Sequence, residues 1–190
     1  MKNSCAAILL LSLLGASQAV KAQEQASKLE AYGGYYYVRV NVNASAAGGS
    51  PGETFNANGG GGQLEYNVNN RLGMVGDLAG YGATATTNGA LVGGVFTYLF
   101  GPRVNFRYGK VTPFVQALFG GVYTTAGIGH SASEDNFAMT AGGGIDIKVS
   151  NHVSVRPIQA EYFMTKIPDG LSNRQDNLRI GAGIVVRLSK

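Results

Sequence analysis

The sequence predicts an all-β fold, an eight-stranded, antiparallel, up-and-down transmembrane β-barrel. Three observations lead to it. Apolar side chains alternate with polar side chains or glycine through about eight segments, each near the ~10 residues that a strand needs to cross a bilayer at a tilt. The connections between these segments alternate between long and short, which is typical of barrels with short periplasmic turns and longer outside loops. After the N-terminal leader, no apolar run is long enough for a transmembrane helix.

The clearest pair of strands occupies residues 94–123 and is joined at 108–110. Every second residue from Phe96 to Phe106 is apolar, and most are aromatic. The positions between them mix glycine with polar and charged side chains such as Arg103. This alternation predicts a sheet with one apolar face and one polar face.

Six further segments have the same character, although the one that contains three consecutive tyrosines does not show which face is apolar. We expect strands at residues 29–42, 59–68, 71–81, 137–149, 153–165 and 176–188. Tight turns are expected at 69–70, 108–110 and 150–152, and long loops at 43–58, 82–88, 124–136 and 166–175.

Residues 1–22 are predicted to be a secretory signal peptide, and residues 23–190 the barrel domain. Lys2 gives the leader a basic start, an apolar stretch follows, and Val20-Lys21-Ala22 provides a small-x-small cleavage signal. The single cysteine, Cys5, lies inside the leader, so no disulfide is expected in the mature chain. Without the leader, 13 basic residues face 11 acidic ones and form no basic run. Nucleic-acid binding is therefore not expected.

The polar face of the alternation carries the candidate site. If the apolar face contacts lipid, these side chains line the lumen, where an unpaired charge is costly. Aromatic residues near the strand ends on the apolar face favour the lipid-facing arrangement over a soluble barrel. The predicted polar network of the lumen comprises Glu65, Asp77, Arg103, Gln116, Asp146, Gln159, Glu161, Arg179 and Arg187, with Gln63 and Lys148 on the same face.

Several runs resemble the small outer-membrane β-barrel proteins of Gram-negative bacteria, related in architecture to the OmpA transmembrane domain. They are Phe100-Gly101-Pro102-Arg103, residues 110–114 and 116–121, the strand around Gly142–Asp146, and the closing Gly-Ile-Val-Val-Arg-Leu strand. The resemblance implies a location in the outer membrane, contact with its lipid, assembly by periplasmic chaperones and the barrel-assembly machinery, and a monomer. The chain departs from many such barrels by ending on Leu188-Ser189-Lys190 instead of Phe, and it lacks the peptidoglycan-binding domain that often follows an OmpA barrel.

Two functions remain open at this stage for the barrel in the membrane. The charged side chains of the lumen either form a structural plug or line a narrow, porin-like ion path. The alternative to both is a secreted, soluble, lipocalin-like barrel that binds a hydrophobic ligand. No enzyme activity, catalytic residue, cofactor or metal is expected. The loop at residues 124–136 holds one histidine among Ser, Glu and Asp, without the ligand spacing of a zinc site.

Overall fold

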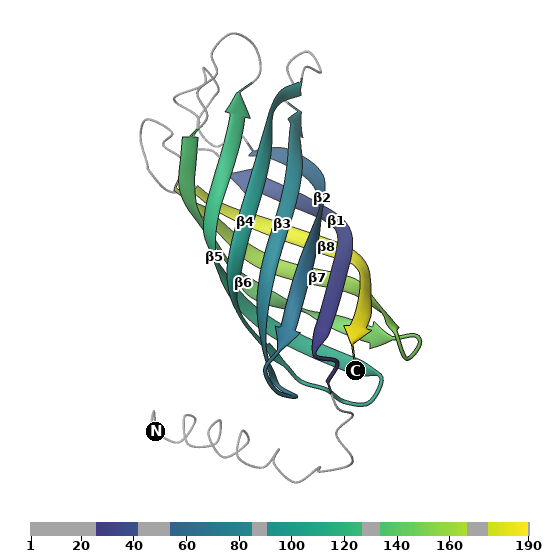
Figure 1. Cartoon of the computed structure of the whole chain (residues 1–190). Coiled ribbons are helices and arrows are strands. Elements are labelled where there is room, and N and C mark those ends of the chain that lie inside the picture. Colours follow the sequence, from purple (N-terminus) through teal and green to yellow (C-terminus); the bar gives the residue numbers. More distant parts are fainter. Residues whose placement is uncertain (1–25, 42–53, 85–90, 127–133, 167–174, 190) are drawn as a thin grey trace, which may run out of the picture.

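The computed structural model describes residues 26–41, 54–84, 91–126, 134–166 and 175–189. Within these ranges the chain forms eight strands that close into one barrel, each paired antiparallel with its neighbours in sequence, and β8 paired with β1. Figure 1 shows the tilted strands, with the start of β1 and the end of β8 at the same end of the barrel. The strands are β1 Leu29–Asn41, β2 Thr54–Asn67, β3 Leu72–Thr84, β4 Leu91–Asn105, β5 Val111–Ala126, β6 Glu134–Lys148, β7 Val153–Thr165 and β8 Gln175–Ser189.

The three predicted tight turns lie at the end of the barrel where β1 begins. In the β2–β3 turn the Asn69 side chain accepts hydrogen bonds from the backbone N–H groups of Arg71 and Leu72, both at 2.8 Å. The β4–β5 turn contains Gly109 with a φ of 60°, a conformation that favours glycine. The predicted fold class and turn positions are confirmed.

The strands extend beyond the predicted bounds at the opposite end. β2 begins at Thr54 instead of residue 59, and β5 continues to Ala126 instead of residue 123. The added segments are rich in Thr, Asn and Ala and lack apolar alternation. They are nevertheless hydrogen-bonded in the ladder, because backbone pairing between strands does not require an apolar face.

The side chains are distributed in the opposite sense to a soluble barrel. Large apolar residues on the outer surface are exposed, such as Phe100 at 58% and Leu64 at 52%. Charged residues on the inside are buried, with Arg179 at 0%. This is the arrangement of a barrel whose outer face lies in lipid. Among the described residues, no helix is long and apolar enough to cross a membrane.

One irregularity in β7 changes which residues face inward. Ile145 pairs with Ile158 and Ile147 with Val155, so Arg156 and Pro157 together stand opposite Asp146. This extra residue is a β-bulge, and it shifts the alternation of the strand by one position. Proline lacks a backbone N–H and is found at such bulges.

Candidate functional site

The lumen is divided into a polar layer near the short turns and a more apolar layer near the other end. The apolar layer contains Val38, Ala57, Ala79, Tyr81, Leu99, Leu118, Val122, Ala138 and Phe163, which form one buried cluster with a few neighbours. Threonine hydroxyls of Thr97 and Thr140 lie buried at the same level. The polar layer contains most of the residues that the sequence placed on the inner face.

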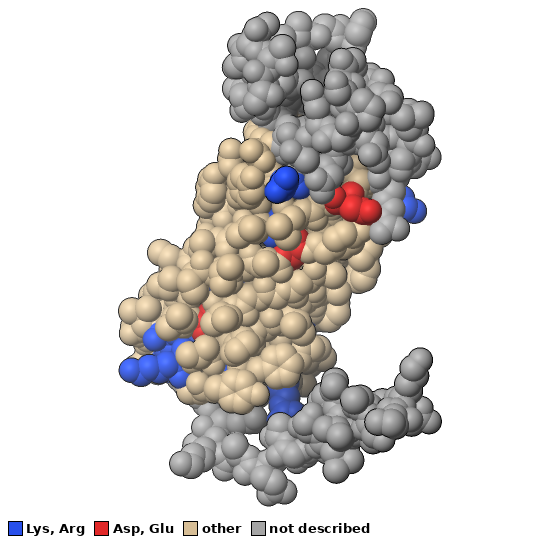
Figure 2. Space-filling model, turned by 180° about the vertical axis from the view of Figure 1, so that it is seen from behind, with Lys and Arg blue, Asp and Glu red and all other residues tan. Residues whose placement is uncertain are grey.

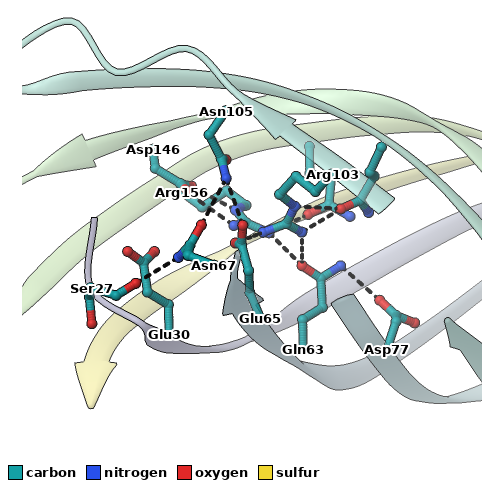
Figure 3. Close-up of polar contacts among 12 residues, drawn as sticks. Ser27, Glu30, Gln63, Glu65, Asn67, Asp77, Arg103, Asn105, Asp146 and Arg156 are labelled. Carbon is teal, nitrogen blue, oxygen red and sulfur yellow. Dashed lines mark hydrogen bonds and ion pairs between the residues drawn. The ribbon is translucent and has the colours of Figure 1, made fainter. Parts of the chain in front are cut away.

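Arg103 on β4 is the first of three buried arginines in the polar layer (Figure 3). Its guanidinium donates to Glu65 at 2.7 Å, to Gln63 at 2.5 Å and, through Nε, to Gln116 at 2.8 Å. Asn105 also donates to Glu65, at 2.6 Å. The buried charge of Arg103 is therefore matched by one carboxylate and two amide oxygens, as a buried cation requires.

Arg156 is the second buried arginine, and it is absent from the set predicted from the sequence. It forms a bidentate pair with Asp146, with Nε–Oδ1 at 2.7 Å and an Nη–Oδ2 distance of 2.9 Å. It also donates to Gln63 and Gln159, both at 2.7 Å. Because Gln159 faces the lumen, strict alternation would place Arg156 on the lipid face, but the bulge turns its side chain into the lumen. Pro157 was the feature of the sequence that could have indicated the bulge.

Arg179 is the third, and it joins two carboxylates from different strands. Its guanidinium lies 2.6 Å from Glu161 and 3.1 Å from Asp77, and it donates to the Tyr81 hydroxyl at 3.1 Å. The Tyr36 hydroxyl donates to Asp77 at 3.2 Å. Tyr36, Asp77, Tyr81 and Glu161 all lie on strands, so these contacts are made within the barrel wall.

Three glutamines connect the arginine centres into one network. Gln63 accepts from Arg103 and Arg156 and donates to Asp77 at 2.8 Å. Gln116 accepts from Arg103 and donates to Glu161 at 2.6 Å. Gln159 likewise accepts from Arg156 and donates to Glu161, at 2.9 Å. An amide can accept and donate at once, which is why it can join ion pairs without adding charge.

Aromatic rings pack against the guanidinium groups. The Phe114 ring centroid lies 4.3 Å from the guanidinium carbons of both Arg103 and Arg156, and the Tyr32 centroid lies 4.4 Å from that of Arg156. Tyr36 lies 4.6 Å from Arg179. These are cation–π distances, so the rings both pack the lumen and stabilise the buried cations.

Inward glycines on the neighbouring strands make room for these rings, since Gly181 pairs with Tyr36 and Gly144 pairs with Phe114. A Cβ at Gly181 would lie 2.6 Å from Cε1 of Tyr36, and one at Gly144 would lie 2.8 Å from Cζ of Phe114. The high glycine content of the sequence is thus partly explained by ring packing inside a narrow barrel.

The structure places Arg187 away from this network, at the rim beside the short turns. Its side chain is 22% exposed and lies 3.8 Å from Glu30, and Arg107 lies 3.5 Å from the same carboxylate. The alternation pattern predicted Arg187 to be part of the polar network of the lumen, and it did not identify Glu30 as a member. The alternation of Leu29, Glu30 and Ala31 was the signal that identifies Glu30 as inward.

No group of three His, Cys, Asp or Glu residues that could hold a metal ion occurs within the described part of the chain. The histidine of the 124–136 loop, His130, lies outside the described residues.

Comparison with known proteins gives the same fold. Neisserial surface protein A is similar with a TM-score of 0.59 and 16% identity, over 87% of this chain and 100% of that one. OprG, an outer membrane protein of Pseudomonas aeruginosa, is similar with a TM-score of 0.53 and 12% identity, over 90% of this chain and 100% of the other. No curated protein sequence matches the chain.

At sequence level, residues 6–185 match the family described as outer membrane protein beta-barrel domain. That match covers most of the chain, and together with the exposed apolar surface it favours the membrane barrel over a secreted lipocalin-like one. The protein is located in the outer membrane, and it belongs to the outer membrane protein beta-barrel domain family.

Proposed function

We propose that this protein is a closed barrel, in which the polar network of the lumen is a structural plug and not a permanent ion path. The observation that carries the proposal is the pairing of Arg103, Arg156 and Arg179. Each is at most 1% exposed, and each contacts at least one carboxylate as well as an amide or hydroxyl group. A conducting pore needs charged groups that exchange partners with passing ions.

The apolar layer also favours a closed lumen. Leu118 and Val122 are completely buried, and Leu99 is 4% exposed. Packed apolar side chains across a narrow lumen exclude water, and a dry constriction opposes ion passage. An ion would therefore have to displace both layers.

The porin-like alternative rests on the continuity of the polar network across the lumen. In that function the arginines would set the anion or cation preference of a narrow path. The two functions differ in wild-type conductance, which is steady for a path and close to zero for a plug.

The test is single-channel recording in planar bilayers of the wild type and of Glu161→Ala. Glu161 accepts hydrogen bonds from Gln116, Gln159 and Arg179, so its removal leaves a buried cation with fewer partners. We expect a nearly silent wild type and brief openings in the variant. Asp176→Ala is the matched control, since Asp176 is exposed on the outer face and accepts a hydrogen bond from Tyr162. Steady, selective wild-type conductance of ordinary porin size would overturn the plug.

The remaining expectations for the protein belong to this proposal. Residues 1–22, which lie outside the described residues, direct export as a signal peptide. The barrel is then delivered by periplasmic chaperones, inserted by the barrel-assembly machinery and stays monomeric, without enzymatic activity. Depletion of the assembly machinery should leave the protein protease-sensitive and unfolded in the periplasm.

A further inference from the structure

A basic residue stands directly before each of the four strands that leave the short-turn end. The pairs are Lys28-Leu29, Arg71-Leu72, Lys110-Val111 and His152-Val153, which precede or open β1, β3, β5 and β7. In each pair the second residue is apolar. The repetition around the barrel places a cation-bearing or imidazole side chain in four equivalent positions.

The backbone confirms that the four positions are equivalent. The carbonyl oxygens of Lys28, Arg71, Lys110 and His152 each accept a hydrogen bond from a backbone N–H near the end of the next strand along the chain. The donors are Asn67, Asn105, Lys148 and Arg187, at 2.7–2.9 Å. The four residues, which we call the basic rim, are thus spread around the circumference of the barrel instead of gathering on one side.

The basic rim lies at the edge of the apolar outer surface. Lys110 is two residues from Tyr108, which is 69% exposed. Arg71 lies in the β2–β3 turn between Val68 and Leu72, which are both exposed apolar residues. Lys28, Arg71, Lys110 and His152 are themselves exposed. Aromatic and apolar side chains that end where cations begin are typical of the depth of lipid headgroups.

These cations have few acidic neighbours. Among the residues that the structure describes, Lys28, Arg71 and Lys110 form no ion pair, and Glu30, which lies inside the lumen, is paired with Arg107 and Arg187. The strand ends of the opposite rim carry Glu134, Asp135 and Asp176 in their sequence. Figure 2 shows Lys and Arg side chains at the lower end of a mostly uncharged middle band.

We propose that the basic rim binds the phosphate headgroups of anionic phospholipids in the periplasmic leaflet of the outer membrane. The ring-like distribution fits an annulus of headgroups better than a single protein partner, which would contact one side. The periplasmic position follows from the short turns and the shared end of β1 and β8. The proposal does not depend on whether the lumen conducts.

The binding is electrostatic, and its size can be estimated. A lysine or arginine at a membrane surface favours an anionic lipid by about fivefold. This preference should fall steeply between low salt and about 1 M salt, where the screening length shrinks to about 3 Å.

The experiment compares two matched double variants in vesicles that contain phosphatidylcholine and phosphatidylglycerol. Arg71→Gln/Lys110→Gln removes two members of the basic rim, and Arg39→Gln/Lys166→Gln removes one arginine and one lysine that are exposed at the other end. Spin-labelled phosphatidylglycerol and phosphatidylcholine report the relative association of each lipid with the barrel. Heat-modifiable gel mobility confirms that each variant is folded.

We expect the wild type to prefer the anionic lipid, the rim variant to lose at least half of that preference, and the control to keep most of it. Equal losses in the two variants would mean that net charge, and not the basic rim, attracts the lipid. A wild type without anionic preference at low salt would also overturn the proposal.

Discussion

Replacing Arg156 by leucine should destabilise the barrel more than any substitution at the rim. Arg156 is 0% exposed, and it provides the two contacts to Asp146 at 2.7 and 2.9 Å as well as one donor each to Gln63 and Gln159. After the substitution, Asp146 keeps no hydrogen-bond partner among the described side chains, although its own side chain is only 10% exposed. Removing one member of a buried pair in this way costs about 3–5 kcal/mol.

The double variant Asp146→Leu/Arg156→Leu should be more stable than Arg156→Leu alone. It removes both charges, so no carboxylate is left buried without a partner. The remaining loss is one hydrogen bond each at Gln63 and Gln159, about 1 kcal/mol apiece. Gln63 still accepts from Arg103, and Gln159 still donates to Glu161, so neither amide is left without any partner.

Arg187→Leu is the matched control, because it removes an arginine from the rim of the same barrel. Its side chain is 22% exposed, and its contact with Glu30 is 3.8 Å long. Arg187 is partly exposed to solvent, and Glu30 keeps its contact with Arg107 after the substitution, so the expected cost is at most about 1 kcal/mol.

The assay is reversible unfolding of the folded barrel in lipid vesicles by guanidinium chloride. The chain has ten tyrosines and no tryptophan, so circular dichroism and tyrosine fluorescence follow the transition. Our reasoning is refuted if Arg156→Leu costs no more than Arg187→Leu. It is also refuted if the double variant is less stable than the single one.

Three further predictions address the outer face, ring packing and orientation. Ile180→Arg puts a charge on the lipid face and should cost roughly 2–4 kcal/mol in the same assay; unchanged stability would mean that this position is not in lipid. Gly181→Val should cost about 1–3 kcal/mol because its Cβ meets the Tyr36 ring at 2.6 Å, whereas Gly80→Val, with nothing within 4 Å, should be nearly neutral. A cysteine at Asn70 should stay unlabelled by an impermeant reagent on intact cells, and one in the connection between β7 and β8 should react; the reverse pattern would invert the orientation.

The fold could be predicted from the sequence because lipid imposes a simple rule on the outer face. Every second residue from Phe96 to Phe106 must be apolar, and the tight turns break this pattern at Asn69-Asn70 and at Gly109. The far ends of the strands could not be predicted. Beyond the apolar band, as in β2 from Thr54, alternation is no longer required, although the backbone remains paired.

The site could be predicted only in part, because it depends on the phase of each strand. Regular alternation selected Arg103, Glu161 and Arg179, and the structure buries all three. It missed Arg156, since a single bulge at Pro157 reverses the phase. Which arginine meets which carboxylate depends on register and on contacts across the lumen, and neither is encoded in the spacing along one strand.

The inner face also determines the register that the outer face leaves open. Sliding β8 by two residues along β7 would keep its apolar side chains in lipid, so the lipid face hardly distinguishes the two pairings. Inside, the same slip would remove Arg179 from its cross-strand partner Glu161. It would also move Gly181 from the Tyr36 ring. The slip would leave buried charges unpaired, and in one direction it would put the Arg179 side chain, instead of Gly181, opposite the Tyr36 ring. The charged network and the glycine-facing rings therefore select one register among several that lipid would accept.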